Sequence, residues 1–215
     1  MGNNGDTMNL LTDLTKIHLE EKNGFIGLND EFFSLCIKKI FDENNQDILI
    51  VTPTLFEANI ISNYLSVYLE NNYLFPMDDF LTSESIAISP DLKITRLETL
   101  NKTLNKNKKI VVTHLNGYLR YLPEKELYEK AIVRIKKGDE YLREKLIKDL
   151  NRLGYSRETL VTKTGEIGVR GYIIDIFPIE YNHPIRIEFF DDEIESIRIF
   201  DEDTQKTIEE IQNCT

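Results

Sequence analysis

The sequence predicts an α/β fold in two parts: a parallel-sheet domain in residues 1–130, followed by a small antiparallel α+β domain in residues 131–206. Helical and strand patterns alternate in the first part, which is typical of a parallel sheet with helices on its faces. Several short strand patterns surround a single helix in the second part. Residues 207–215 are expected to begin a further segment, as if the chain were a fragment of a longer protein.

Apolar residues at helical spacing define the helices of the first part, and we expect them at residues 8–21, 31–41, 55–69 and 90–104. Asn29 or Asp30 can cap the second of these helices, and Ser89 followed by Pro90 can open the last. Strands are expected at residues 24–28, 47–52 and 109–113. The second and third are nearly continuous apolar runs, which is typical of strands covered on both faces.

The second part begins with an expected strand at residues 131–135, a turn at 136–138, and a helix from a cap at Asp139 to Leu153. Gly154 is placed to end that helix in the left-handed conformation. Short strand patterns separated by turns then follow at residues 167–170, 172–177, 185–190 and 194–200.

The chain carries 26 Lys and Arg against 37 Asp and Glu, a net charge of −11, which argues against a dedicated nucleic-acid binder. The charge is segmented, because residues 101–150 hold 13 basic and 7 acidic side chains. Such segmentation suits oriented contact with a partner, and it is equally compatible with solvated faces of uneven sign.

Several classes of protein are excluded by composition. No apolar run is long enough to span a membrane, and no secretory signal pattern is present at the start, so a cytoplasmic protein without a membrane partner is expected. Cys36 and Cys214 stand too far apart in sequence to suggest a disulfide framework.

Catalytic signatures are missing from the sequence. A phosphate-binding loop needs glycines followed by Lys and Ser or Thr, and residues 24–31 contain no lysine but two carboxylates. His18, His114 and His183 have no His or Cys neighbour at the spacing of metal ligands. We therefore expect no catalytic residues, no metal and no cofactor in this chain.

The strand at residues 185–190 is the most informative segment. Alternation places Ile185, Ile187 and Phe189 on the core face, and it places Arg186, Glu188 and Phe190 together on the other. Arginine beside an aromatic residue is enriched at protein–protein hot spots, whereas an isolated surface phenylalanine is also common.

Two further arginines are candidates for the same interface. Arg170 precedes Gly171, which can allow a bulge that redirects the arginine, and Arg157 follows the predicted helix. Pairing of both with the acidic residues 191–195 inside the domain is the alternative.

Longer motifs carry a resemblance to known proteins. Residues 165–178 (GEIGVRGYIIDIFP) and 185–198 (IRIEFFDDEIESIR) resemble a motif shared by the excision-repair protein UvrB and the bacterial transcription-repair coupling factors, the Mfd family. Three other segments look more like the coupling factors, namely VTPT at 51–54, FPMDDF at 75–80 and RLETL at 96–100. UvrB has a phosphate loop and a DNA-gripping hairpin, and this chain lacks the first and has little room for the second.

The resemblance therefore implies the N-terminal module of a coupling factor: a degenerate UvrB-like domain without ATPase activity, followed by a domain that binds UvrA. It implies that the chain recruits UvrA to stalled transcription complexes for nucleotide excision repair. In the longer parent it implies contacts with RNA polymerase, ATP-dependent movement on duplex DNA, and a C-terminal domain that masks the UvrA-binding face.

Motif positions of the family's UvrA-contacting residues fall on Arg170, Arg186 and Phe190, and less closely on Arg157; Glu188 lies on the same strand face. Where UvrB has a further arginine, this chain has Gly168. An ATP-dependent DNA motor or damage-binding module as in UvrB is the alternative function, and direct DNA binding by residues 101–150 is another. ATP titration would distinguish the first, and salt-dependent DNA binding the second.

Overall fold

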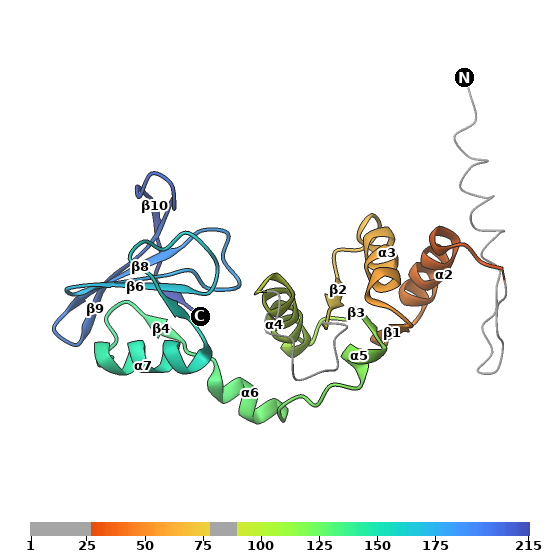
Figure 1. The fold of residues 1–215 in the computed structure, drawn as a ribbon, viewed down its shortest axis with the longest axis horizontal. Coiled ribbons are helices and arrows are strands. Elements are labelled where there is room, and N and C mark those ends of the chain that lie inside the picture. The colour runs from red at the N-terminus through yellow and green to blue at the C-terminus, as the bar shows by residue number, and fades with distance from the viewer. Residues whose placement is uncertain (1–26, 78–89) are drawn as a thin grey trace, which may run out of the picture. The chain divides into compact units, whose positions relative to one another are not determined.

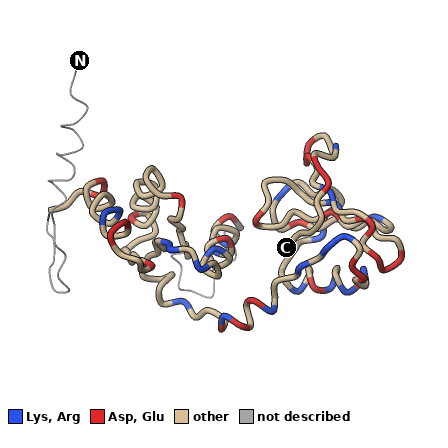
Figure 2. The backbone as a smooth tube through the Cα atoms, turned by 180° about the vertical axis from the view of Figure 1, so that it is seen from behind, with Lys and Arg blue, Asp and Glu red and all other residues tan. Residues whose placement is uncertain are grey.

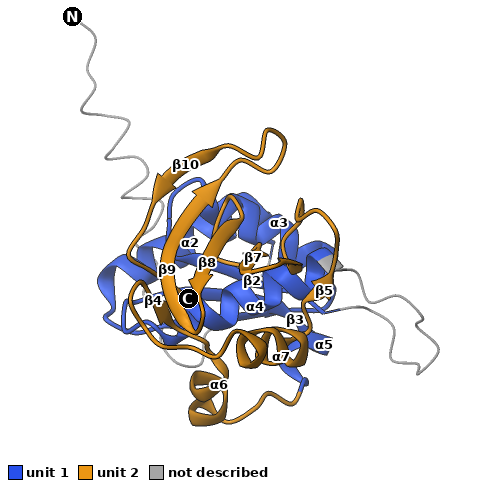
Figure 3. Ribbon diagram, turned by 90° about the vertical axis from the view of Figure 1, so that its left-hand side faces the viewer, with its two compact units in different colours: residues 1–120 blue, residues 121–215 orange. Residues whose placement is uncertain are grey.

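The computed structural model describes residues 27–77 and 90–215. The chain forms two compact units, Met1–Arg120 and Tyr121–Thr215, so the division falls earlier than the expected boundary at residue 130 (Figure 3). Each unit has its own core. No helix in the described residues is both long enough and apolar enough to cross a membrane.

The first unit alternates helices and strands, as expected (Figure 1). Its elements are α2 (Asp30–Glu43), β1 (Ile48–Thr52), α3 (Leu55–Ser66), β2 (Asn72–Phe75), α4 (Pro90–Leu104), β3 (Ile110–His114) and α5 (Leu115–Tyr118). The strands form a three-stranded parallel sheet in the order β1-β3-β2. The strand β2 had not been predicted. The helix expected at residues 8–21, and most of the strand expected at 24–28, lie outside the described residues.

Local capping explains where two of these helices begin. The Asn29 side chain accepts a hydrogen bond of 2.8 Å from the amide of Phe32 at the start of α2. A capping box starts α3, because Thr54 and Glu57 satisfy each other's backbone amides. Both arrangements occupy amide donors that have no partner inside the helix.

The prediction that the strand at 47–52 is covered on both faces is wrong for the described residues. Ile50 packs in the core with residues of α2 and α3, but Leu49 and Val51 point the other way and are exposed. The strand β1 lies at an edge of the sheet, and the residues of α2 and α3 in the core pack on the side of Ile50.

The second unit is built on antiparallel strands. Its elements are α6 (Lys125–Ala131), β4 (Ile135–Lys136), α7 (Arg143–Leu153), β5 (Ser156–Arg157), β6 (Glu166–Arg170), β7 (Ile173–Ile176), β8 (Ile185–Phe190), β9 (Glu193–Phe200), β10 (Thr207–Glu210) and β11 (Asn213–Cys214). Six strands form one sheet in the order β10-β9-β8-β7-β6-β5, and β11 pairs with β4. Only the β5–β6 pair of the larger sheet is parallel. The predicted fold class, a parallel α/β part followed by an antiparallel α+β part, is confirmed.

The start of this unit differs from the prediction. The strand expected at 131–135 shrinks to Ile135–Lys136, because α6 extends to Ala131. Asp139 does not cap α7; its carboxylate instead accepts a hydrogen bond from the Lys136 amide and closes the turn before the helix. The expected end of the helix at Gly154 is confirmed, with φ at 94°.

Residues 207–215 contribute two strands to the second unit, although they were expected to begin another segment. The strand β10 pairs with β9, and β11 pairs with β4. The Cys214 side chain is buried in the core of this unit. Burial raises the pKa of its thiol to about 12, so the cysteine stays protonated near neutral pH.

One face of the six-stranded sheet packs against α7 and forms the core (Figure 1). Leu146 and Leu150 of the helix belong to one core cluster with isoleucines from four consecutive strands, β6 to β9. The paired rows Val169–Ile174–Ile187–Ile197 and Ile167–Ile176–Ile185–Ile199 lie on this face. The opposite face of the sheet is not covered by α7.

We expect Ile187→Ala to lower the free energy of unfolding by about 2–5 kcal/mol, because it leaves a cavity in the centre of the core. Ile208→Ala, at a half-exposed isoleucine of β10, is the matched control and should change stability by no more than about 0.5 kcal/mol. Urea unfolding followed by circular dichroism measures both, and equal losses would contradict the placement of the core.

Candidate protein-interaction site

The predicted alternation along β8 is confirmed. Ile185, Ile187 and Phe189 are buried on the core face. Arg186 and Glu188 lie partly exposed on the other face, and Phe190 ends the strand with 70% of its surface exposed. The strand therefore displays two charged side chains and one uncovered aromatic ring on the face away from α7.

The centre of this outer face is Asp175 on β7, which is only 3% exposed. Strand register places it between Gly168 of β6 and Arg186 of β8. Its Oδ1 accepts a hydrogen bond of 2.7 Å from Arg186 Nε, and its Oδ2 accepts one of 3.0 Å from Arg186 Nη2. Arg170 Nη2 donates to the same Oδ2 at 2.6 Å. One buried carboxylate thus holds two arginines from the strands on either side.

Sequence reasoning did not single out Asp175, although a signal was present. A carboxylate in an otherwise apolar strand must find a partner if it is buried, because an unpaired buried charge is costly. Asp175 alternates with Ile174 and Ile176, so it had to lie on the face opposite the core. The identity of its partners depended on the register between strands.

The Arg186 guanidinium is largely engaged in contacts inside the unit. It lies 4.4 Å from the centroid of the buried Phe200 ring, and Nη2 also donates to Gln205 Oε1 at 3.1 Å. The hydrogen bonds to Asp175 raise the pKa of Arg186, against the lowering effect of burial. Only 17% of this side chain is exposed, so it offers a small area to a partner.

Arg170 is different, because 51% of its side chain stays exposed while it contacts Asp175. The alternative in which Arg170 pairs with the acidic residues 191–195 is not what the structure shows, since its ion pair is with Asp175. Arg157 is exposed on β5, and its register partner is the core-facing Ile167. Arg157 therefore does not belong to the row of Asp175 and Arg186.

Glu188 takes part in cross-strand contacts on the same face. It accepts a hydrogen bond of 2.9 Å from Ser196 Oγ and forms an ion pair with Arg198, both on β9. Because both its oxygens are engaged, Glu188 helps fix the β8–β9 pair. It stands next to Phe190 along the outer face of β8.

Gly168, the position at which the resemblance to UvrB suggested an arginine, lies under a covered part of the outer face. A Cβ atom at this position would lie 3.2 Å from the side chain of Val161 and 3.5 Å from the Glu158 carbonyl. Val161 is buried, so the loop before β6 covers this part of the sheet. Of the arginines singled out from the sequence, Arg170 and Arg186 lie on this face, which also carries Arg198.

The basic stretch at residues 101–150 is distributed over several elements of both units (Figure 2). Lys109 contributes to an ion pair with Asp47, and Lys137 to one with Glu210. Helices α6 and α7 carry acidic residues among their lysines. The stretch does not form one continuous basic element.

One cluster could not be foreseen from linear spacing. His183, Asp201 and Glu202 bring ligand-type atoms within 4.8 Å of one another, the one such group in the described parts of the chain. His183 Nδ1 lies 2.9 Å from Glu202 Oε2, and this contact lowers the pKa of the Glu202 carboxyl. Asp201 uses one oxygen to bind the Thr204 amide and hydroxyl. The contact between His183 and Glu202 ties the β9–β10 loop to the loop before β8, and the contacts of Asp201 lie within the β9–β10 loop.

Comparison with known proteins agrees with this architecture. Residues 133–215, which lie in the second unit, match the family model described as the UvrB interaction domain. Over 85% of its length the chain is 34% identical to the transcription-repair-coupling factor of Bacillus subtilis (strain 168). It is 32% identical, over 95% of its length, to the factors of Staphylococcus aureus strains bovine RF122 / ET3-1 and Mu50 / ATCC 700699. The chain spans only 16–18% of the length of these relatives.

We expect Asp175→Asn to lower the free energy of unfolding by about 3 kcal/mol, because it leaves the mostly buried guanidinium of Arg186 without a carboxylate. Asp203→Asn, at an exposed aspartate of the same unit, should change stability by no more than about 0.5 kcal/mol. Chemical denaturation of the two variants is the measurement. Equal stabilities would show that Asp175 does not organise the face.

Proposed function

We propose that this chain is a non-catalytic interaction module that binds UvrA through the outer face of its second unit and recruits it to stalled transcription complexes. The observation that carries the proposal is the exposed Phe190 ring on the same sheet face as the half-exposed Arg170. The match to the UvrB interaction domain and the similarity to coupling factors support it.

The chemistry of the face suits a protein partner. Burying an exposed phenylalanine contributes about 1.5–3 kcal/mol, and aromatic residues with arginines dominate many interfaces. Arg170 keeps further N–H donors beyond the one on Asp175, which can bind a carboxylate of the partner. Phe190 would fill an apolar pocket while Arg170 fixes the orientation.

The candidate residues divide into two roles in this proposal. Phe190 and Arg170 contact UvrA, and Arg186 acts mainly by holding Asp175 and the adjoining strands in place. Glu188 supports the neighbouring strand pair, with a minor share of contact. Arg157, on the edge strand β5 in register with the core-facing Ile167, is assigned no direct contact in this proposal.

The remaining activities are proposed for the longer parent protein. Since the chain spans a small part of its relatives, we assign RNA polymerase binding, ATP-dependent movement on DNA and masking of the UvrA face to segments outside it. The first unit is proposed to be a relic of a nucleotide-binding domain, because residues 24–31 lack the lysine and the Ser or Thr of a phosphate loop.

We expect Phe190→Ala and Arg170→Ala each to weaken binding to purified UvrA by about tenfold or more, because each removes a contact at the centre of the interface. Isothermal titration calorimetry with the 215-residue chain measures the affinity.

The matched controls are Phe56→Ala, at an exposed phenylalanine of α3, and Arg152→Ala, at an exposed arginine of α7. Both should bind UvrA as the unmodified chain does. Unchanged affinity in the Phe190 and Arg170 variants, with their folding intact by circular dichroism, would remove the proposal.

A further inference from the structure

A second exposed aromatic side chain lies at the end of the sheet that carries Phe190. Tyr172 is 61% exposed and follows Gly171 in the turn between β6 and β7. Gly171 adopts a φ of +58°, so the turn reverses the chain tightly. The Phe189 amide donates to the Tyr172 carbonyl at 2.9 Å, which ties this turn to the last residues of β8. Tyr172 and Phe190 therefore stand on adjoining backbone segments.

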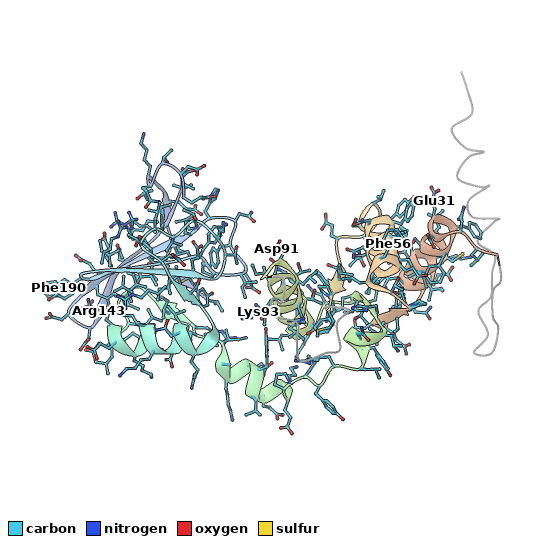
Figure 4. All side chains as sticks on the ribbon, in the orientation of Figure 1. Glu31, Phe56, Asp91, Lys93, Arg143 and Phe190 are labelled. Carbon is cyan, nitrogen blue, oxygen red and sulfur yellow. The ribbon has the colours of Figure 1, made fainter. Side chains whose placement is uncertain are left out.

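Arg143, the first residue of α7, holds this turn from the other side. Its guanidinium carbon lies 5.6 Å from the centroid of the Tyr172 ring, and its Nη1 donates to the Gly171 carbonyl. Figure 4 shows Arg143 and Phe190 at the same end of the second unit. Leu142, the residue before Arg143, is also exposed. The ring of Tyr172 is thus held in place before any partner arrives, which reduces the entropy lost on binding.

The charges at this end are arranged on two sides. Arg143 and Arg170 lie next to the β6–β7 turn, whereas Asp191 and Asp192 form the β8–β9 turn and Glu193 begins β9. A partner surface with carboxylates is attracted to the first turn and repelled by the second. This polarity fixes the orientation in which such a partner can bind.

We infer that the docking surface continues from Phe190 around the end of the sheet onto Tyr172 and Arg143. The inference rests on the proposed function, and it adds a second aromatic contact and a third arginine to the interface. The partner surface then needs two apolar recesses and carboxylates that face Arg143 and Arg170. Tyrosine and arginine are the residue types that most often dominate binding at the centre of interfaces.

The test is a calorimetric titration of the full chain with purified UvrA. Tyr172→Ala is expected to weaken binding by about tenfold, and Tyr172→Phe, which keeps the ring, by no more than about twofold. Arg143→Gln removes both the contact with the ring and the hydrogen bond to the turn, and a loss of about threefold or more is expected. Tyr121→Ala, at a fully exposed tyrosine of the same unit, is the matched control and should leave binding unchanged.

The outcomes separate this inference from the proposal beneath it. If Phe190→Ala weakens binding and Tyr172→Ala does not, the extended surface is wrong and the proposed function stands. If neither variant weakens binding, the proposed function fails as well. Thermal unfolding of each variant identifies losses of affinity that are caused by misfolding. A Tyr172→Phe variant that binds UvrA as weakly as Tyr172→Ala would overturn the role of the ring.

Discussion

The buried carboxylate of Asp175 is the constraint on which the outer face depends. A charge removed from water must be paired and hydrogen-bonded, and Asp175 meets this requirement through Arg170 on one neighbouring strand and Arg186 on the other. Three adjacent strands are consequently joined by side chains as well as by backbone hydrogen bonds. Because two positive charges surround one negative charge, the cluster keeps a net positive charge, and this charge is displayed at Arg170, the more exposed arginine.

The same pairing specifies the register of the sheet. A shift of one residue along β7 would turn Asp175 toward the isoleucine core and expose Ile174, so the ion pairs and the core would be lost together. The register of β8 with β9 places Phe190 opposite Glu193 at the end of the strand. Gln205 extends the network from Arg186 into the β9–β10 loop, which the contact between His183 and Glu202 ties to the loop before β8. A site made of few residues is thus supported by most of the second unit.

Local patterns in the sequence were sufficient where the structure is decided by neighbours along the chain. The alternation along β8, the Asn29 cap and the end of α7 at Gly154 follow from side-chain periodicity and backbone chemistry. The pairing of strands that are far apart in the sequence could not be predicted from local patterns. The partners of Asp175, the pairing of residues 207–210 with β9 and the exposure of Leu49 on β1 depend on which strands become neighbours, and no single segment encodes that. Asp139 shows a local ambiguity, since an aspartate closes a turn as readily as it caps a helix.

In this protein, an arginine that forms an internal ion pair can also contribute to an interface. Arg170 and Arg186 both bind Asp175, yet one remains half exposed and the other is enclosed by Phe200 and Gln205. The internal pair removes much of the conformational freedom of Arg170, so a partner that binds it has less entropy to overcome. Charge alone therefore does not reveal the function of the face. The aromatic ring is more informative, because most of the Phe190 surface remains in water although the adjacent Phe189 is buried in the core on the other side of the strand.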